Sequence, residues 1–293
     1  MDDRILQVGV EINGELKVYS DAAMTVKTTK STDSKQNSCE VTIANLLKDN
    51  IDYLVTETSP WNPNPKPKLL TVIAGRQSMG TDRIFIGDIT NSLPTMPPDR
   101  VLTMKASTQD GAKYVWATRQ SPKTVAISTL ARDIASDYGL RLKFEATDKT
   151  ISNYLYNGSL AKQIEKLELV GDIDCFIDDE TLVVKDIGKG LSGVVPLIAS
   201  TTCMIGTPTP DDKGIKVRIL FDPNIHPGDQ IALQSEVNPA LDGQYVIYSM
   251  AITLANREQP WYADLACSND NIKSIAAKRE ASQKKDAKQE PKP

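Results

Sequence analysis

Alternating apolar and polar residues open the chain and predict a β-hairpin. The alternation crosses one Asn-Gly step, and its apolar members are Val8, Val10, Ile12, Leu16 and Val18. A two-residue turn at Asn13-Gly14 would place Ile12 opposite Glu15, which mixes apolar and charged residues on one face. A three-residue loop from Asn13 to Glu15 places Ile12 opposite Leu16 instead. Because the buried face sets strand register, we expect the three-residue loop with a bulge.

Further strand patterns fill the first hundred residues. Residues 39–43 alternate as a half-buried strand, and Asn45 is a candidate N-cap for a short helix that ends near Val55. Alternate prolines in 60–67 cannot donate ladder hydrogen bonds, so this stretch is expected to be an extended loop. Strand patterns resume after it, near residues 68–74, 83–89 and 100–107.

The period changes in the middle of the chain. Apolar residues from Ile127 to Tyr138 recur every three or four positions, which predicts a helix that stops at Gly139. A second helix is expected from Leu160 to Gly171. A hairpin follows over residues 175–184, with an acidic tip. This helix, helix and hairpin order predicts a small α/β unit over residues 121–190.

After Gly188 the two-residue period returns. The expected strands lie near residues 193–198, 214–221, 230–235, 244–254 and 260–267, with turn signals at 208–214, 223–228 and 242–243. This spacing is typical of a barrel or sandwich. The sequence therefore predicts an α+β fold that is mainly β, without a repeat of fixed period. The expected regions are a first β-rich domain (1–120), the α/β unit (121–190), a second barrel-like domain (191–267) and a charged C-terminal tail (268–293).

Composition narrows the class of protein. Of the residues, 40% are hydrophobic and 25% are charged, with a net charge of −4, so nothing global indicates capture of nucleic acid or of an anionic membrane. The start of the chain lacks a signal-peptide pattern, and no run of 18 apolar residues occurs, so no membrane insertion is expected. The four cysteines are widely spaced and have no CxxC pair. We expect them to be buried or half-buried thiols in a reducing compartment.

Three motifs resemble a cofactor, catalytic or metal site, and each is better explained by an ordinary structural role. Residues 188–193 match GxGxxG, but a strand with a proline follows where a dinucleotide site needs a helix, so we expect a linker. His226 is the single histidine and lies in a turn, so we expect it to be solvated rather than catalytic. The acidic residues of 172–180 lack the spacing of a calcium loop and are expected to be a solvated hairpin tip. The sequence therefore predicts no catalytic residue, metal or cofactor.

Partner contacts are expected at two places. Trp61 lies in the proline loop and is a candidate interface anchor, whereas Trp116 and Trp261 lie in strand patterns and are expected in the core. Residues 272–293 carry a net charge of +4 and no aromatic side chain, which favours a solubilising or partner-docking tail over a nucleic-acid site. The candidate contacts in that tail are the basic side chains of Lys278, Arg279, Lys284 and Lys285.

The order of segments between about residues 40 and 267 carries a family resemblance. It rests on residues 40–46 with 70–75 and 83–89, on the helix at 125–138 ending in Tyr138-Gly139-Leu140, and on the helix at 159–171 with its hairpin. A third series lies at 205–208, 214–217, 220–225, 227–229, 243–247 and 260–261. In this order the segments resemble the central hub proteins of phage tail baseplates, especially those of contractile tails. Gly75-Arg76 departs from the glycine-tyrosine step of that family, and the proline loop is also unusual.

The resemblance implies a structural virion protein assembled in the host cytoplasm. Each β domain would resemble a tail-tube subunit, and three copies would form a pseudo-sixfold ring. That ring would join the tail tube to the central spike, with the tape-measure protein as a further possible partner.

Two alternatives from other classes stay open. A tail-associated peptidoglycan hydrolase would need an acid and base pair, and nothing in the sequence singles one out. A nucleic-acid-binding β-barrel module would need a basic face with aromatic residues. Residues 1–271 hold 27 basic and 35 acidic residues, which argues against that module.

Overall fold

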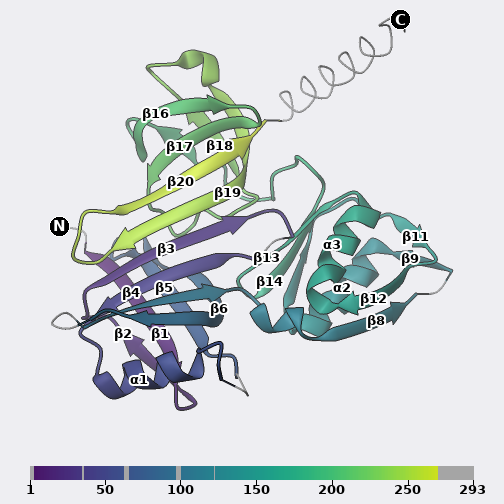
Figure 1. Ribbon diagram of the computed structural model, residues 1–293. Helices are drawn as coiled ribbons and strands as arrows, with labels where there is room; N and C mark the ends of the chain where they lie inside the picture. Colours follow the sequence, from purple (N-terminus) through teal and green to yellow (C-terminus); the bar gives the residue numbers. More distant parts are fainter. Residues whose placement is uncertain (1–2, 35, 63–65, 97–99, 122, 270–293) are drawn as a thin grey trace, which may run out of the picture.

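A computed structural model gives the fold of residues 3–34, 36–62, 66–96, 100–121 and 123–269. About half of the chain is β-strand, and the chain forms a β body with a smaller α/β unit at its side (Figure 1). The mainly β fold class expected from the sequence is confirmed. The basic tail residues from Lys278 onwards lie outside the described residues.

Within the described residues, the first β half of the body contains seven strands and one helix. Its third, fourth and seventh strands alternate between buried and more exposed positions, as half-buried strands should. The elements are β1 (Arg4–Ile12), β2 (Glu15–Tyr19), β3 (Met24–Ser31), β4 (Ser38–Ala44), α1 (Lys48–Glu57), β5 (Leu69–Arg76), β6 (Gly80–Pro94) and β7 (Val101–Ser107).

The second β half comes from the other end of the chain. Its elements are β15 (Leu197–Ala199), β16 (Met204–Asp211), β17 (Gly214–Leu220), β18 (Gln230–Gln234), η2 (Pro239–Leu241), β19 (Gly243–Ala255) and β20 (Trp261–Ser268). β19 pairs antiparallel with β3 over seven residue pairs, so both halves share one sheet in the order β16-β17-β20-β19-β3-β4-β7-β6-β5-β1-β2 (Figure 1). One apolar core runs through both halves.

The small α/β unit has its own core. Its elements are η1 (Asp110–Lys113), β8 (Trp116–Gln120), β9 (Thr124–Ala126), α2 (Ile127–Tyr138), β10 (Arg141–Phe144), β11 (Thr150–Ser152), β12 (Leu155–Ser159), α3 (Leu160–Gly171), β13 (Asp174–Asp178) and β14 (Thr181–Lys185). α2 and α3 pack on the sheet β10-β14-β13 and bury one apolar face each. β8 pairs with β12 of this unit although it lies before residue 120, and the domain limits stay a prediction.

Both predicted helices of this unit are confirmed. α2 ends at Gly139, whose φ of 68° is the left-handed conformation that a glycine adopts readily after a helix. α3 ends at Gly171, and Asp172 takes the left-handed position instead.

The register expected for the first hairpin is wrong. Ile12 lies opposite Glu15, so the turn has two residues, Asn13 and Gly14, with φ of 56° and 81°. Two consecutive positive φ values define the turn that Asn-Gly favours. This local preference prevails because β2 is a terminal strand, where Leu16 and Val18 stay 50% and 58% exposed.

Two further local expectations fail. Asn45 does not cap α1, which begins at Lys48, and its φ of 60° places it in a left-handed turn. The expected turn over 208–214 is mostly strand β16, which contains Pro208 and Pro210. Prolines are tolerated there because β16 is the last strand of the sheet and pairs on one side with β17.

Candidate interaction surfaces

A cluster of charged residues joins the small α/β unit to the β body. Lys30 lies on the buried face of β3, because alternation along that strand turns it towards the core side, and it is 2% exposed. Its Nζ lies 2.7 Å from an oxygen of Asp178 and 2.8 Å from one of Asp179. Both carboxylates stand at the tip of the β13–β14 hairpin. The tip is therefore docked on the body, and the expectation of a solvated tip is wrong.

His226 and the start of β6 extend this cluster. The imidazole lies 3.5 Å from Asp178 through Nδ1 and 3.6 Å from Asp82 through Nε2. Arg83 binds Glu180 at 2.6 Å. His226 is thus held between carboxylates instead of being solvated, because the turn that carries it folds against the hairpin tip. We call the residues of these contacts the junction cluster; they are Lys30, Asp82, Arg83, Asp178, Asp179, Glu180 and His226.

The electrostatics of the junction cluster follow from burial and pairing. Burial opposes the charged form of Asp178, but Lys30 and His226 outweigh it and hold the pKa of Asp178 well below its usual range. Burial also disfavours charged Lys30, yet the two carboxylates raise the pKa of Lys30. Burial raises the pKa of Asp179 despite Lys30. The hydrogen bond to Asp178 raises the pKa of His226 against the effect of its burial.

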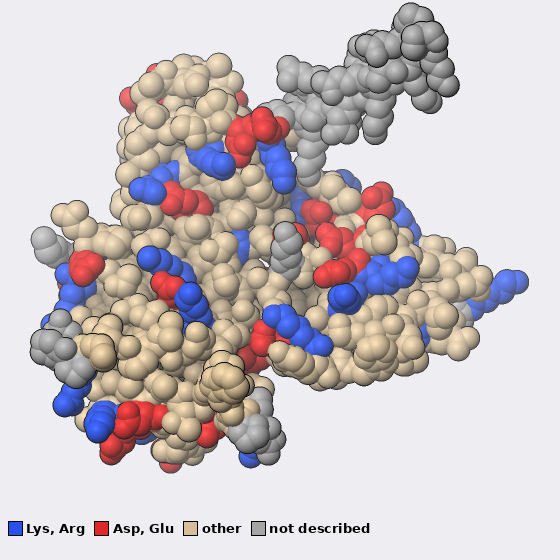
Figure 2. All heavy atoms as spheres, viewed as in Figure 1, with Lys and Arg blue, Asp and Glu red and all other residues tan. Residues whose placement is uncertain are grey.

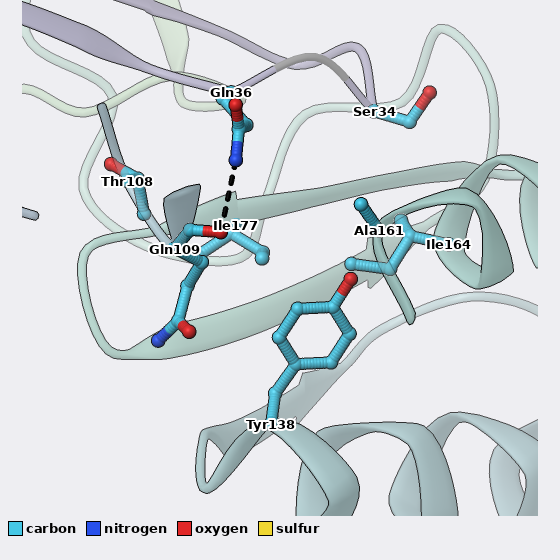
Figure 3. Close-up of a pocket in the computed structure, with 8 residues that line it drawn as sticks. All are labelled: Ser34, Gln36, Thr108, Gln109, Tyr138, Ala161, Ile164 and Ile177. Atoms are coloured by element: carbon cyan, nitrogen blue, oxygen red, sulfur yellow. Dashed lines mark hydrogen bonds between the residues drawn. The ribbon is translucent and has the colours of Figure 1, made fainter. Parts of the chain in front are cut away.

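A narrow hollow lies along the same seam. It has a volume of about 20 Å³ and lies between the ends of β3 and β7 and the helices α2 and α3 (Figure 3). Two of its polar groups bond to the protein itself: Gln36 donates to the Gln109 carbonyl at 3.0 Å, and the Tyr138 hydroxyl donates to the Leu160 carbonyl at 2.7 Å. None of the described residues that line the hollow is a carboxylate, a histidine or a lysine.

Outside the junction cluster, the metal-ligating and thiol side chains of the described residues lie apart from one another. No group of three metal-ligating side chains occurs among the described residues. Cys39, Cys175 and Cys267 are buried, and Cys203 is partly buried, as expected. Burial raises the pKa of the Cys39 and Cys267 thiols to about 12, which keeps them unreactive. The glycine-rich residues 188–193 form a loop between β14 and β15, as expected.

The three tryptophans have different environments. Trp261 is 2% exposed in the core, where its ring meets Phe221 edge to face at 5.8 Å. Trp116 is 70% exposed, so its expected core position is wrong; β8 and β12 form a two-stranded ribbon, and its outer face leaves the indole to donate to Asn157 at 2.8 Å. Trp61 is 91% exposed, but its role as an interface anchor stays a prediction.

Charges of both signs mix over the visible face of the body (Figure 2). The exposed side of the long sheet carries pairs such as Arg218 with Asp264 at 2.7 Å and Lys105 with Glu40 at 3.8 Å. None of the described helices is both long enough and apolar enough to cross a lipid bilayer.

Several solved structures have the same fold. A tail protein from Neisseria meningitidis MC58 superposes with a TM-score of 0.64 at 10% identity, over 92% of this chain and 98% of its own. The 43 kDa tail protein of prophage MuSo2 from Shewanella oneidensis gives 0.62 at 7% identity, over 91% and 98%. The E. coli c3393 protein, a type VI secretion component described as similar to T4 tail proteins gp27 and gp5, gives 0.58 at 9% identity, over 89% and 76%. The fold is that of phage tail proteins.

The family model for baseplate hub gp41 matches residues 5–267. The chain belongs to the baseplate hub gp41 family, and it is a structural component of a phage tail baseplate. No curated protein matches the sequence. The resemblance drawn from the order of segments is thereby confirmed.

Proposed function

We propose that three copies of this hub form a pseudo-sixfold ring that joins the tail tube to the central spike. One observation carries the proposal, namely that the two β halves have the same strand plan. In the first half the hairpin β3–β4 is followed by β5, the long β6 and β7. In the second half the hairpin β16–β17 is followed by β18, the long β19 and β20. Three chains would therefore supply six similar units.

The pairing orders of the two halves also match. β4, β7, β6 and β5 are successive neighbours in the first half, and β17, β20, β19 and β18 are successive neighbours in the second. Both long strands carry a bulge at the same step, between Ile89 and Asn91 in β6 and between Ile247 and Ser249 in β19. This agreement supports a duplicated unit rather than two unrelated sheets.

The two faces of the long sheet suit a ring with a wet channel. One face is the apolar core, and the other presents threonine and charged residues at alternate positions, such as Thr42, Thr103 and Lys27. A closed ring protects its strand edges and needs large symmetric interfaces. The polar face is the one that could line water without exposing the core.

Light scattering on the purified protein tests the ring directly. We expect a mass near three times 32.1 kDa, and electron microscopy should give a ring with six similar lobes. A mass of one chain at every concentration would overturn the proposal. A twofold assembly would also contradict it, because a pseudo-sixfold ring from two similar halves needs three copies.

Tube, spike and tape-measure proteins are the proposed partners, and Trp61 and the basic C-terminal segment are the proposed contacts. Assembly would take place in the host cytoplasm and end in the virion. We expect Trp61→Ala, or removal of the chain after Asn271, to reduce co-purification of a tube or spike protein. Trp116→Ala removes an equally large exposed ring elsewhere and serves as the matched control. Unchanged co-purification in both test variants would rule these contacts out.

We propose further that the hub has no catalytic role. The mixed charges of the visible face also argue against a nucleic-acid-binding module (Figure 2). Lysis of cell-wall substrate by the purified protein, or salt-sensitive retention of DNA, would each contradict this. We expect neither.

A further inference from the structure

The two duplicated halves of the sheet, taken together from β16 to β6, have an edge at each end that meets no strand within the described residues. At one end lies β16, which pairs with β17 alone. At the other end lies the last part of β6, residues 90–94. β5 accompanies β6 as far as Asp88, after which the Ile89 amide bonds to the Lys68 carbonyl, while β7 continues to Pro94. Unpaired edges of this kind are usually covered or paired.

The duplicated strand order predicts which strand each unpaired edge would pair with. β19 is the counterpart of β6, and its equivalent stretch pairs with β3 from Ser249 to Ala255. β3 is the counterpart of β16, because each is the first strand of the corresponding hairpin. The β3–β19 joint inside the chain thus brings together the counterparts of the two unpaired edges. Each copy carries both edges, so a second copy is the partner that fits them.

The register of that contact follows from the same correspondence. Ile89 and Ile247 mark the bulges, so Leu93 corresponds to Ala251. Thr29 opposite Ser38 is the last residue pair of the β3–β4 hairpin, and Asp211 opposite Gly214 is the last pair of the β16–β17 hairpin. Asp211 is therefore the counterpart of Thr29. Within the chain, Ala251 lies opposite Thr29. Leu93 of one copy is therefore expected opposite Asp211 of the next.

We propose that β16 of one copy pairs antiparallel with residues 90–94 of β6 of a second copy, with Asp211 opposite Leu93. This inference rests on the proposed ring and specifies its joint. A contact between two different edges propagates in one direction and closes when the rotation allows it, as a ring requires. Apolar side chains on both edges add area: Leu93 and Met96 are 52% and 87% exposed, and Ile205 is 38% exposed.

The prolines of β16 reduce the hydrogen bonding that this joint can form, compared with the β3–β19 joint inside the chain. Pro208 and Pro210 cannot donate hydrogen bonds, and two extra residues lie between the ladder positions Ile205 and Thr209. The joint between copies is therefore expected to have fewer main-chain hydrogen bonds than the β3–β19 joint. Such an edge resists indiscriminate pairing until a matching copy is in place.

A paired cysteine experiment tests the register. Leu93→Cys and Asp211→Cys are combined in a Cys203→Ser background, because Cys203 is the most accessible native thiol. Side chains opposite each other on neighbouring strands are close enough for a disulfide. Mild oxidation should link two and then three copies, with on the order of tenfold more linked chain than either single variant gives, because the edges are held together.

Two matched controls accompany it. Thr29→Cys with Ala251→Cys has the same geometry inside one chain and should oxidise without any change in mass. Leu93→Cys with Val18→Cys uses β2 at the other end of the sheet and should link no copies. If that second pair links as efficiently as the first, the inference is wrong.

Light scattering on the same samples separates this inference from the ring itself. A trimeric mass without linkage at Leu93 and Asp211 overturns the joint and leaves the ring standing. A monomeric mass overturns both. A charge exchange gives a second readout that needs no oxidation: Leu93→Asp should lower the trimer fraction by repelling Asp211, and adding Asp211→Lys should restore it. Failure of the restoration, with both variants folded by circular dichroism, counts against the joint.

Discussion

Two joints within this chain connect segments that are far apart in sequence, and they use different physics. The β3–β19 joint uses seven paired residues of main chain and a shared apolar core. The small α/β unit meets the body through the ion pairs of the junction cluster, through hydrogen bonds such as that from the Asn37 amide to the Ile177 carbonyl, and through a small apolar contact of Phe176, Val183 and Leu191. Main-chain pairing with a continuous core makes one unit, whereas ion pairs over a small apolar contact attach a separate one.

The largest effect is expected from Lys30→Ala in the junction cluster. The change leaves Asp178 and Asp179 buried without their cation, and breaking such a pair costs roughly 3–5 kcal/mol of unfolding free energy. Urea denaturation measures it. Lys27→Ala on the same strand is the control, since Lys27 is exposed and should change the free energy by less than about 0.5 kcal/mol. Equal effects of the two would refute a stabilising junction cluster.

A slightly smaller effect is expected in the β3–β19 joint. Leu254 and Val26 lie opposite each other there, and both are fully buried. Leu254→Ala should lower the unfolding free energy by about 3 kcal/mol, through lost burial and the cavity left behind. Leu169→Ala on α3 removes the same atoms from a side chain that is 78% exposed, and should be nearly neutral. A nearly neutral Leu254→Ala would contradict a core shared by the two halves.

The joints should also differ in pH dependence. The pKa of His226 is raised, so its protonated form contributes stability fully below an unfolded value of about 6.5, and this is lost as pH rises through the folded pKa. The pKa of Asp178 is lowered, so its contribution is present above about pH 4 and is lost as pH falls through the folded pKa. Both are therefore present between about pH 4 and 6.5.

Denaturation at pH 6 and pH 9 measures the histidine part of that window. Wild-type stability should fall from pH 6 to pH 9, and His226→Gln should flatten the change. The groups that face His226 are Asp82, Asp178, Lys30 and Asp229. An unaltered pH dependence in His226→Gln would exclude the histidine as its source.

The smallest effect is expected from Trp116→Ala in the small unit. Its ring is mostly exposed, so the loss should stay within about 1 kcal/mol, the size of its hydrogen bond to Asn157. Trp261→Ala in the body core should cost roughly 3–5 kcal/mol. Thermal unfolding of the two variants compares them, and similar shifts would be inconsistent with the exposed position of Trp116.

The order of the segments also allowed the baseplate hub family to be predicted from the sequence. Apolar periodicity and turn residues predict the order of strands and helices, so that order can be recognised without three-dimensional information. The duplication of the two β halves is different. Their sequences show no fixed repeat, because a β plan needs alternation and turns but no particular residues. The duplication is recognised only in the structure, from the pairing order of the strands and from the matched bulges at Ile89 and Ile247.

The sequence by itself determined the elements whose causes are local. The apolar period and Gly139 defined α2, and strict alternation defined β3, β4 and β7. The tertiary structure alone decided which exposed positions stay exposed and which charges meet. Lys30 and Asp178 are 148 residues apart and are paired by the way a hairpin tip docks. Position in the sheet likewise let β2 keep an Asn-Gly turn and β16 keep its prolines, because a terminal strand has one neighbour to satisfy.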